Sequence, residues 1–303
     1  MLPKPPPRSG QIGFLYLPPF RVQGVSVAGE QTAIHVPELG LGFDIGLCPR
    51  PILSAQIIAL THGHMDHVAG LPYYFSQRVF QKIGTGTCVC HHSIAGAIQN
   101  MVGSWVDLEQ QNTPYKIIPL KHGESIQIKP NVFLKGLEAK HTVPAMSYVV
   151  TEHRNKLKSK FKNLPQTKLK NLKSQGEKIT NTVVLPLVAC TGDTQISDHL
   201  FDVDFCEANI VITECTFFEE KHRDRALVGK HLHIHDVVEL LSVWKAKHVV
   251  ITHTTRRTTM DSVRQKIKEV VPKEHWERVH LLMDHRTNRS RYEKQVAELG
   301  EGG

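Results

Sequence analysis

The chain has 303 residues, 40% of them hydrophobic, so it is apolar enough to bury a substantial core and is not disordered as a whole. No run approaches the roughly 18 apolar residues of a membrane-spanning helix, and the proline-rich start lacks the apolar stretch of a secretion signal, so we expect a cytoplasmic protein with no membrane partner. Six cysteines are too few to indicate a disulfide framework, and the formal net charge of +8 favours a polyanionic partner.

The predicted elements begin after a proline-rich stretch at residues 1–10, which we expect to be a flexible N-terminus ahead of one domain over 11–303. Short apolar runs predict strands at 33–36, 41–44, 57–61, 87–90, 116–119, 132–139, 147–150, 183–190, 210–214 and 248–252. Apolar residues at helical spacing predict helices at 70–77, 92–101, 235–244 and 260–271. This order of elements suits a layered α/β domain with two sheets between helices.

A dense cluster of metal-binding side chains follows the strand predicted at 57–61. The cluster is His62-Gly63-His64-Met65-Asp66-His67. Imidazole and carboxylate are common zinc ligands, and the glycine permits the tight backbone that lets neighbouring side chains converge. The spacing indicates two ions, with His62 and His64 directed to one and Asp66 and His67 to the other.

The segment Cys88-Val89-Cys90-His91-His92 superficially looks like a second metal site. No further pair of cysteines or histidines stands nearby to complete a tetrahedral set. Because side chains alternate along a strand, we expect Cys88 and Cys90 to face one part of the core and Val89 to face the other.

Two metal ions require further ligands, and later strand ends offer them. His141, Asp193 and His253 each follow a predicted strand directly or closely. Each residue taken alone is more typical of an ordinary turn. Together with the first cluster they favour a dinuclear centre, in which an aspartate bridging two cations would keep them about 3.5–4 Å apart.

The positive charge is concentrated in one segment. Between Arg154 and Lys178 stand nine lysines and arginines and one glutamate, which together account for the whole net charge of +8. This segment has few large apolar residues and interrupts the strand pattern, so we expect an inserted basic arm at 153–180. A local excess of this kind is an electrostatic footprint for nucleic acid or an anionic membrane surface.

The ligand series resembles that of the metallo-β-lactamase superfamily, and within it the chain resembles the ribonuclease Z (tRNA 3′-processing endonuclease) branch. Two further segments support the branch, Thr213-Glu214-Cys215-Thr216-Phe217 and Gly229-Lys230-His231-Leu232-His233-Ile234. The first is similar to a His-Glu-Ala-Thr segment of that branch, and the second to a Gly-His-Ser-Thr segment. The resemblance runs from about Asp44 to His253.

The resemblance implies a four-layer αββα metallo-β-lactamase sandwich with an inserted basic arm. It also implies two Zn²⁺ ions per subunit, one held by His62, His64 and His141, the other by Asp66, His67 and His253, with Asp193 shared. The arm lies between His141 and Asp193, where ribonuclease Z proteins insert a Gly-Pro-rich arm that grips tRNA. Its candidate RNA-binding residues are Lys156, Lys158, Lys160, Lys162, Lys168, Lys170 and Lys173. A tRNA precursor or other RNA is the implied partner, and a homodimer is possible.

The implied reaction is cleavage of the 3′ trailer of precursor tRNA by a zinc-activated hydroxide that Asp66 helps to orient. His231, with Glu214 on its other nitrogen, would protonate the leaving 3′-oxygen, and His233 is the rival for this role. A hydrolase of a small molecule, such as a cyclic nucleotide, lactone or thioester, is the first alternative. An RNA-binding module with an inactive site is the second. The basic arm favours the nuclease, because a small-molecule enzyme has no evident use for it.

Overall fold

The computed structural model describes residues 1–6 and 12–300, so residues 7–10 of the expected flexible N-terminus lie outside the described residues. Within the described residues the chain forms two mixed seven-stranded sheets. In spatial order the first contains β1 (Gly13–Leu17), β2 (Phe20–Val27), β3 (Gln31–Val36), β4 (Leu41–Phe43), β5 (Ile57–Ala59), β6 (Gly86–His91) and β7 (Tyr115–Leu120). The second contains β8 (Ser125–Lys129), β9 (Val132–Ala139), β10 (Ala145–Leu157), β11 (Thr180–Cys190), β12 (Ile210–Glu214), β13 (His248–Thr252) and β14 (Val279–Leu281).

Each sheet changes from antiparallel to parallel pairing part of the way across. The first is antiparallel from β1 to β4 and parallel from β4 to β7. The second is antiparallel from β8 to β11 and parallel from β11 to β14. Parallel strands need helical crossovers, and these place helices on the outer faces of both sheets.

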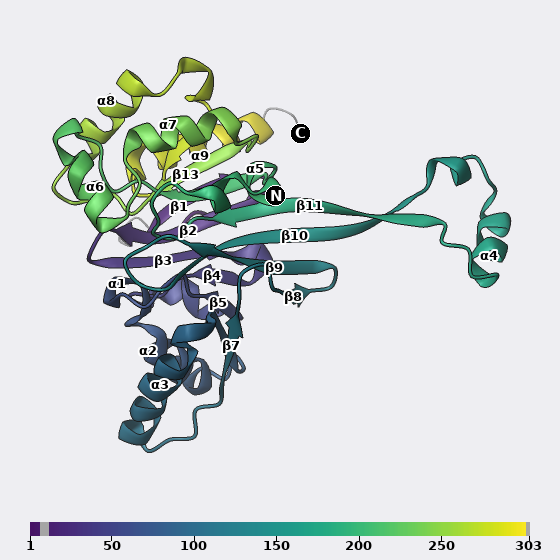
Figure 1. The fold of residues 1–303 in the computed structure, drawn as a ribbon, viewed down its shortest axis with the longest axis horizontal. Coiled ribbons are helices and arrows are strands. Elements are labelled where there is room, and N and C mark those ends of the chain that lie inside the picture. The colour runs from purple at the N-terminus through teal and green to yellow at the C-terminus, as the bar shows by residue number, and fades with distance from the viewer. Residues whose placement is uncertain (7–11, 301–303) are drawn as a thin grey trace.

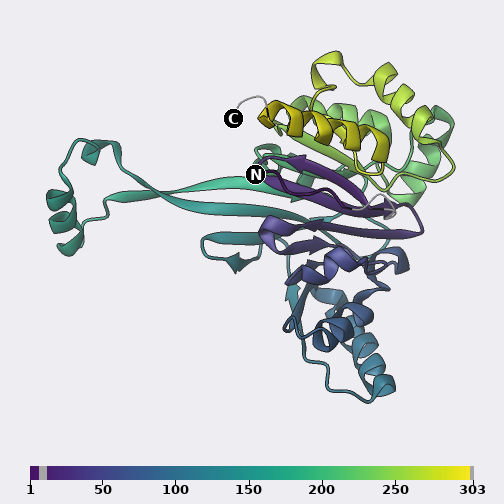
Figure 2. The same ribbon diagram turned by 180° about the vertical axis from the view of Figure 1, so that it is seen from behind.

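The helices cover the two sheets from outside, except for the one at residues 166–174, which lies in the basic segment (Figure 1). They are α1 (Met65–Val68), α2 (Leu71–Phe80), α3 (Ala95–Glu109), α4 (Gln166–Ser174), α5 (Val203–Cys206), α6 (Arg223–Gly229), α7 (Ile234–Val243), α8 (Met260–Val270) and α9 (His285–Gly300). Helices α2 and α3 lie against the first sheet, whereas α7 and α8 lie against the second. Helix α9 packs beside β1, where Tyr292 meets Phe14 edge to face (Figure 2).

Three apolar clusters define the layers. Phe43 and Tyr148 belong to the cluster between the two sheets. Tyr74 belongs to the cluster under α2 and α3, and Leu241 to the cluster under α7 and α8. The order is therefore helices, sheet, sheet, helices, which is the predicted four-layer αββα arrangement.

The alternation expected at 88–90 is present in β6. Cys88 and Cys90 are buried in the cluster under α2 and α3, whereas Val89 is buried between the sheets. All six cysteines are free thiols in the structure. None of the helices in the described ranges is long and apolar enough to cross a membrane.

Several strands have the predicted bounds, and others were missed. The strands predicted at 132–139, 210–214 and 248–252 match β9, β12 and β13. Strands β1, β2, β8 and β14 were not predicted. Glycine and alternating polar side chains weaken the apolar pattern of β2, and β14 has only three residues.

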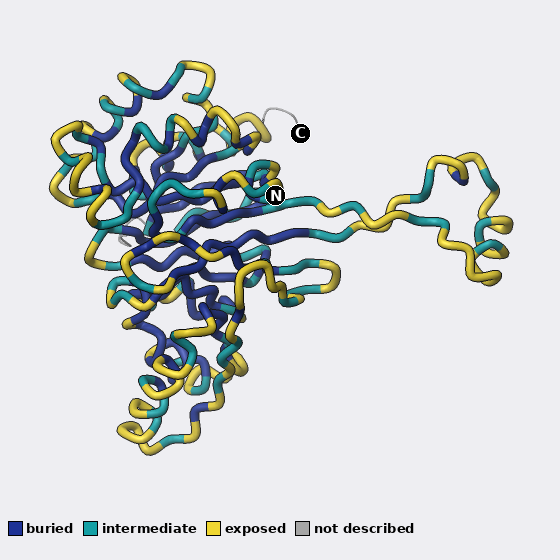
Figure 3. The backbone as a smooth tube through the Cα atoms, in the orientation of Figure 1, coloured by how far each residue is buried: buried dark blue, intermediate teal, exposed yellow. Residues whose placement is uncertain are grey.

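The basic segment extends outward from the second sheet. Strands β10 and β11 pair from Tyr148 with Cys190 to Leu157 with Thr180, but β9 accompanies β10 only as far as Glu152. Beyond that residue the two-stranded ribbon leaves the sheet and ends in a small tip containing α4, which Figure 1 shows projecting far from the domain. The tip is mostly exposed, as Figure 3 shows, although Phe161 is buried within it.

Candidate metal centre

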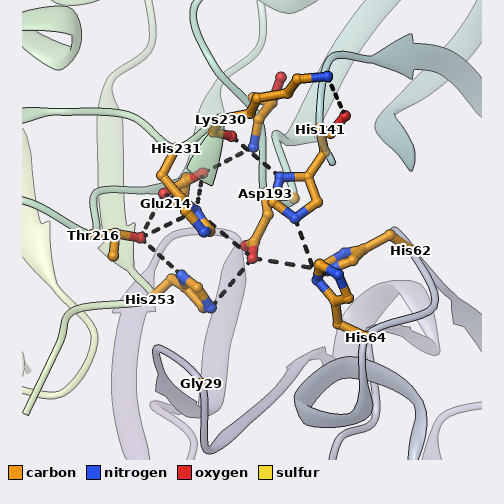
Figure 4. Close-up of polar contacts among 12 residues, drawn as sticks. Gly29, His62, His64, His141, Asp193, Glu214, Thr216, Lys230, His231 and His253 are labelled. Atoms are coloured by element: carbon orange, nitrogen blue, oxygen red, sulfur yellow. Dashed lines mark hydrogen bonds and ion pairs between the residues drawn. The ribbon is translucent and has the colours of Figure 1, made fainter. Parts of the chain in front are cut away.

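The predicted ligands come together where strands of both sheets end. His62 lies just beyond β5 and His253 just beyond β13. His141 and Asp193 follow β9 and β11, which run in the same direction within the second sheet. The carboxyl ends of strands are the usual position for chemistry in α/β folds. Figure 4 shows these side chains directed toward one another.

Three histidines form a first set of converging ligand atoms. Nε2 of His62 lies 2.9 Å from Nδ1 of His64, and Nε2 of His141 lies 3.3 Å from the same Nδ1 atom. His62 is fully buried. Burial, followed by repulsion from His67, lowers the pKa of His62 to about 2, which keeps this imidazole neutral and able to bind a metal.

Asp66, His67 and His253 form a second set. The Nε2 atoms of His67 and His253 lie 3.4 Å apart, and Oδ2 of Asp66 lies 3.6 Å from each of them. Oδ2 of Asp193 lies 3.3 Å from both of these Nε2 atoms and 3.9 Å from Nε2 of His62. Asp193 therefore stands between the two sets, where a bridging ligand would be.

The donor atoms fit two zinc ions. Ligands roughly 2.0–2.1 Å from a tetrahedral zinc ion lie ~3.3 Å from one another, close to the separations within each set. Across residues 1–6 and 12–300, Asp66 and Asp193 form ion pairs with histidines alone. Burial opposes ionisation of Asp193, but His253 and His67 hold its pKa well below the usual range. Asp193 is therefore held as a carboxylate, the form that binds a cation.

Asp44 was not anticipated as a site residue, yet it orients two of the histidines. Its Oδ2 accepts from Nδ1 of His67 at 2.8 Å and from Oγ1 of Thr61 at 2.8 Å. The Thr61 hydroxyl in turn lies 3.0 Å from Nδ1 of His62, so it can accept from that ring. Both rings are thereby fixed with Nε2 free to bind a metal. The one sequence signal was that Asp44 ends a predicted strand.

Glu214 orients two other histidines in the same way. Its Oε1 lies 3.0 Å from Nδ1 of His231, and its Oε2 accepts from Oγ1 of Thr216 at 2.7 Å. Thr216 was also not anticipated, and its hydroxyl lies 2.9 Å from Nδ1 of His253. The backbone amide of Thr194 donates to Oε1 of Glu214 at 2.8 Å. Each buried carboxylate, Asp44 and Glu214, thus holds one ring directly and a second through a threonine.

Backbone groups fix two more of the predicted ligands. Nδ1 of His141 lies 3.2 Å from the carbonyl oxygen of Lys230, and Nζ of Lys230 donates to the carbonyl oxygen of His141 at 2.9 Å. The amide of Gly29 donates to Oδ2 of Asp66 at 2.9 Å. The loop that carries His231 is therefore tied directly to a ligand of the first set.

The two rival histidines occupy different places. His231 stacks on His253 with ring centroids 5.3 Å apart, and its Nδ1 is engaged by Glu214. Burial alone would lower the pKa of His231, but the carboxylates of Glu214 and Asp193 raise it to about 9. His233 instead caps α7 in a capping box with Asp236. The structure thus places His231, and not His233, beside the ligand sets.

The seven predicted RNA-binding lysines lie away from these ligands, on the projecting ribbon and its tip. Six of them are exposed and Lys158 is half-buried. Among the described side chains, Lys160 is the one of the seven with an ion pair, which it forms with Glu177 at 3.2 Å. The others present free positive charge to solvent.

Comparison with known proteins supports the resemblance seen in the sequence. No protein-family model matches the chain. It is 29% identical over 258 residues to tRNase Z TRZ2, chloroplastic, of Arabidopsis thaliana, a match that covers 84% of this chain and 73% of that protein. It is 29% identical over 257 residues to tRNase Z TRZ1 of the same plant, covering 84% of this chain and 91% of that protein.

Solved structures agree with this result at the level of the fold. The metallo-β-lactamase fold protein YhfI of Bacillus subtilis superposes with a TM-score of 0.58 at 14% identity, covering 89% of this chain and 95% of that chain. Human tRNase Z, short form, superposes with a TM-score of 0.57 at 16% identity, covering 81% and 93%. The chain has the metallo-β-lactamase fold, as predicted, and the resemblance to the ribonuclease Z branch is confirmed. These similarities indicate a metal-dependent hydrolase.

Proposed function

We propose that this chain, which has the metallo-β-lactamase fold and resembles tRNase Z proteins, is a dinuclear zinc endoribonuclease that removes the 3′ trailer of precursor tRNA. The observation that carries the proposal is the His231–Glu214 pair beside the two ligand sets. This pair can act as a general acid, which hydrolysis of an ester with a good leaving group does not need. Cleavage of an RNA strand does need a general acid, because the 3′-oxygen of ribose leaves poorly without a proton.

We assign one zinc ion to His62, His64 and His141 and the second to Asp66, His67 and His253, with Asp193 shared. Bound there, the ions would lower the pKa of a water molecule and stabilise negative charge that develops on the phosphate. Asp66, fixed by the amide of Gly29, orients the attacking water. In-line attack on phosphorus then breaks the bond to the 3′-oxygen.

His231 supplies the proton to that oxygen. Glu214 occupies Nδ1, so the proton to be transferred is carried on Nε2. Glu214 and Asp193 also stabilise the imidazolium form by raising the pKa of His231 to about 9, which keeps the acid protonated at neutral pH. The products are a tRNA end with a free 3′-hydroxyl and a trailer with a 5′-phosphate.

The basic arm gives the proposal its substrate class. Its exposed lysines bind phosphates far from the scissile bond, which adds affinity for a long RNA and little base specificity. The names of the plant relatives support tRNA as that RNA. A homodimer stays a prediction. The cytoplasmic location also stays a prediction, since one relative is named for the chloroplast and another for the nucleus. The division into an N-terminus, one domain and an arm at 153–180 is likewise our proposal.

A cleavage assay with metal analysis of the same sample tests the proposal. Zinc-loaded protein should release the trailer from a 3′-extended precursor tRNA, and two zinc ions per chain should be measured. End analysis should find a 3′-hydroxyl, which distinguishes this reaction from that of contaminating ribonucleases that leave a cyclic phosphate. Failure to cut the precursor, together with hydrolysis of a small phosphodiester, lactone or thioester, would favour the small-molecule hydrolase instead.

A further inference from the structure

A basic groove lies between α8 and α9, apart from the metal centre. Two adjoining cavities of about 250 Å³ and about 710 Å³ meet there, and both are lined by Arg264 and Arg291. No residue of the two ligand sets lines either cavity. Figure 2 shows α9 crossing this side of the molecule. The groove is large enough to take a ligand of several hundred daltons.

Arg291 is the feature that points to an anion. Its side chain is half-buried, and Nη1 donates to Nδ1 of His280 at 3.2 Å. Nε2 of His280 lies 3.2 Å from Nδ1 of His248, so the guanidinium is held by a chain of neutral rings. Its Nε has no partner, and no carboxylate in the described ranges forms an ion pair with it. Glu277 also lines both cavities and acts on Arg291 electrostatically, but it forms no ion pair with it. A partly buried guanidinium with an unpartnered N–H favours binding of an anion.

The rest of the groove indicates what else the ligand carries. Arg264 is neutralised by Asp284 at 2.7 Å, but the exposed cations Lys268, Arg286 and Lys294 have no ion pair within residues 1–6 and 12–300. Trp276 lines the smaller of the two cavities and is 38% exposed. Its indole nitrogen already donates to the Val271 carbonyl at 2.9 Å. The groove also contains the carboxylates of Glu277, Asp284 and Glu298, but its five lysines and arginines outnumber them. A ring without a free polar atom beside this excess of cations suits an aromatic group joined to a phosphate.

We propose that this groove binds a nucleotide, with its phosphate on Arg291 and Arg286 and its base against Trp276. The nucleotide is either a free nucleoside phosphate or one nucleotide of a bound RNA strand. In both cases the recognition chemistry is the same. The site is separate from the proposed catalytic reaction, so its occupancy is measured as binding and does not depend on cleavage.

Titration calorimetry with zinc-loaded protein tests the site. ADP should bind saturably and at least about 10-fold more tightly than inorganic phosphate or adenosine alone, since each of these supplies only half of the contacts. Arg291→Met and Arg286→Ala should each weaken binding about 10-fold or more. Arg289→Ala is the matched control, because Arg289 lies on the same helix but pairs with Glu293 outside the groove. In a Trp105→Phe background, quenching of Trp276 fluorescence should follow the same binding curve.

A second arm of the experiment identifies the source of the nucleotide. If ADP does not bind but a short single-stranded oligoribonucleotide does, and Arg286→Ala weakens that binding while Arg289→Ala does not, the groove takes a nucleotide of an RNA strand. Because Arg286 is exposed, its replacement leaves the fold intact even if Arg291→Met does not fold. The proposal is overturned if neither ligand binds, or if Arg286→Ala and Arg289→Ala have the same effect.

Discussion

Oδ2 of Asp44 accepts from Nδ1 of His67 at 2.8 Å, and through the Thr61 hydroxyl it also orients His62. One buried carboxylate therefore prepares one ring of each ligand set. Asp44 adopts a positive φ of 58°, which brings its side chain back over the strand end toward Thr61. The metal centre therefore depends on this contact as well as on its own ligands.

Asp44→Asn should weaken zinc binding about 10- to 100-fold. The amide oxygen of asparagine can still accept from the backbone N–H of Thr61. Its NH₂ group, however, would take the place of Oδ2, which now accepts hydrogen bonds from Thr61 and His67. His67 would then hold its proton on the nitrogen that must bind metal. Competition with a chromophoric chelator measures the affinity. Asparagine tolerates positive φ, so the circular dichroism spectrum of the variant should not change. An unchanged zinc affinity would contradict the proposed role of Asp44 in orienting His67 and His62.

His231→Ala should reduce the rate of precursor-tRNA cleavage about 10²- to 10⁴-fold while zinc content stays the same. The loss should be far smaller with bis(p-nitrophenyl) phosphate, because p-nitrophenolate leaves without a proton. Comparison of the two substrates separates an acid from a residue that only holds the fold. His233→Ala is the matched control and should cost about 1 kcal/mol of stability as a lost helix cap, with little change in cleavage rate. Equal losses on both substrates would count against His231 as the acid.

Glu214→Gln should move the alkaline limit of the cleavage rate to lower pH. Glu214 and Asp193 raise the pKa of His231 to about 9 against the opposing effect of burial. A general acid acts while protonated, so the rate falls as pH rises through that pKa, and removal of Glu214 lowers the pH at which the fall begins. Profiles of kcat/KM between about pH 6 and pH 10 measure the shift. A profile that keeps its position in the variant would rule out this pairing.

Removal of the arm should weaken precursor-tRNA binding about 10-fold or more and reduce its salt dependence. Asn155 pairs with Thr182, so replacing residues 156–181 by the dipeptide Asn-Gly closes the ribbon with a short turn and keeps the strands in register. A cut at 156–173 alone would leave strands of unequal length. Turnover of bis(p-nitrophenyl) phosphate serves as the control and should not change. If binding and salt dependence persist, the lysines do not contact the RNA.

The sequence indicated which candidate ligands converge but not the residues that orient them, for a physical reason. His62 to His67 are contiguous and of metal-binding types, so they were visible without any knowledge of the fold. Asp44 and Thr216 act on rings that are 23 and 37 residues away along the chain, and only the folded sheets bring them together. The hydrogen-bonding role of an aspartate or threonine leaves no local pattern to detect.

The same reason explains what was missed in the fold. Helix α9 is strongly polar, because it covers the edge of the sandwich with one narrow side and leaves the rest exposed. No apolar period therefore predicted it. The arm or hairpin was predicted from charge, but the strands that form it were predicted only to residue 150 and from residue 183. The reason is that β10 is buried for seven residues and then half-buried or exposed, so its apolar pattern ends there.

Acid should destabilise the protein through His280, and His280→Gln should relieve part of the effect. Burial, then Arg291 and His248, lowers the pKa of His280 to about 3. A folded-state pKa below the unfolded value of about 6.5 gives stability that is present above that value and lost as pH falls toward the folded one. Between pH 7 and pH 5 the loss should be about 2 kcal/mol, since each pKa unit corresponds to about 1.4 kcal/mol.

Urea unfolding at the two pH values measures this difference in parent and variant. Glutamine can accept from Arg291 and donate to His248 as the imidazole does, so the variant should fold and should lose less stability in acid. Zinc release also destabilises the protein in acid, but it affects parent and variant alike and cancels in the comparison. Equal acid sensitivity of the two proteins would show that burial and Arg291 do not hold His280 neutral in the folded protein.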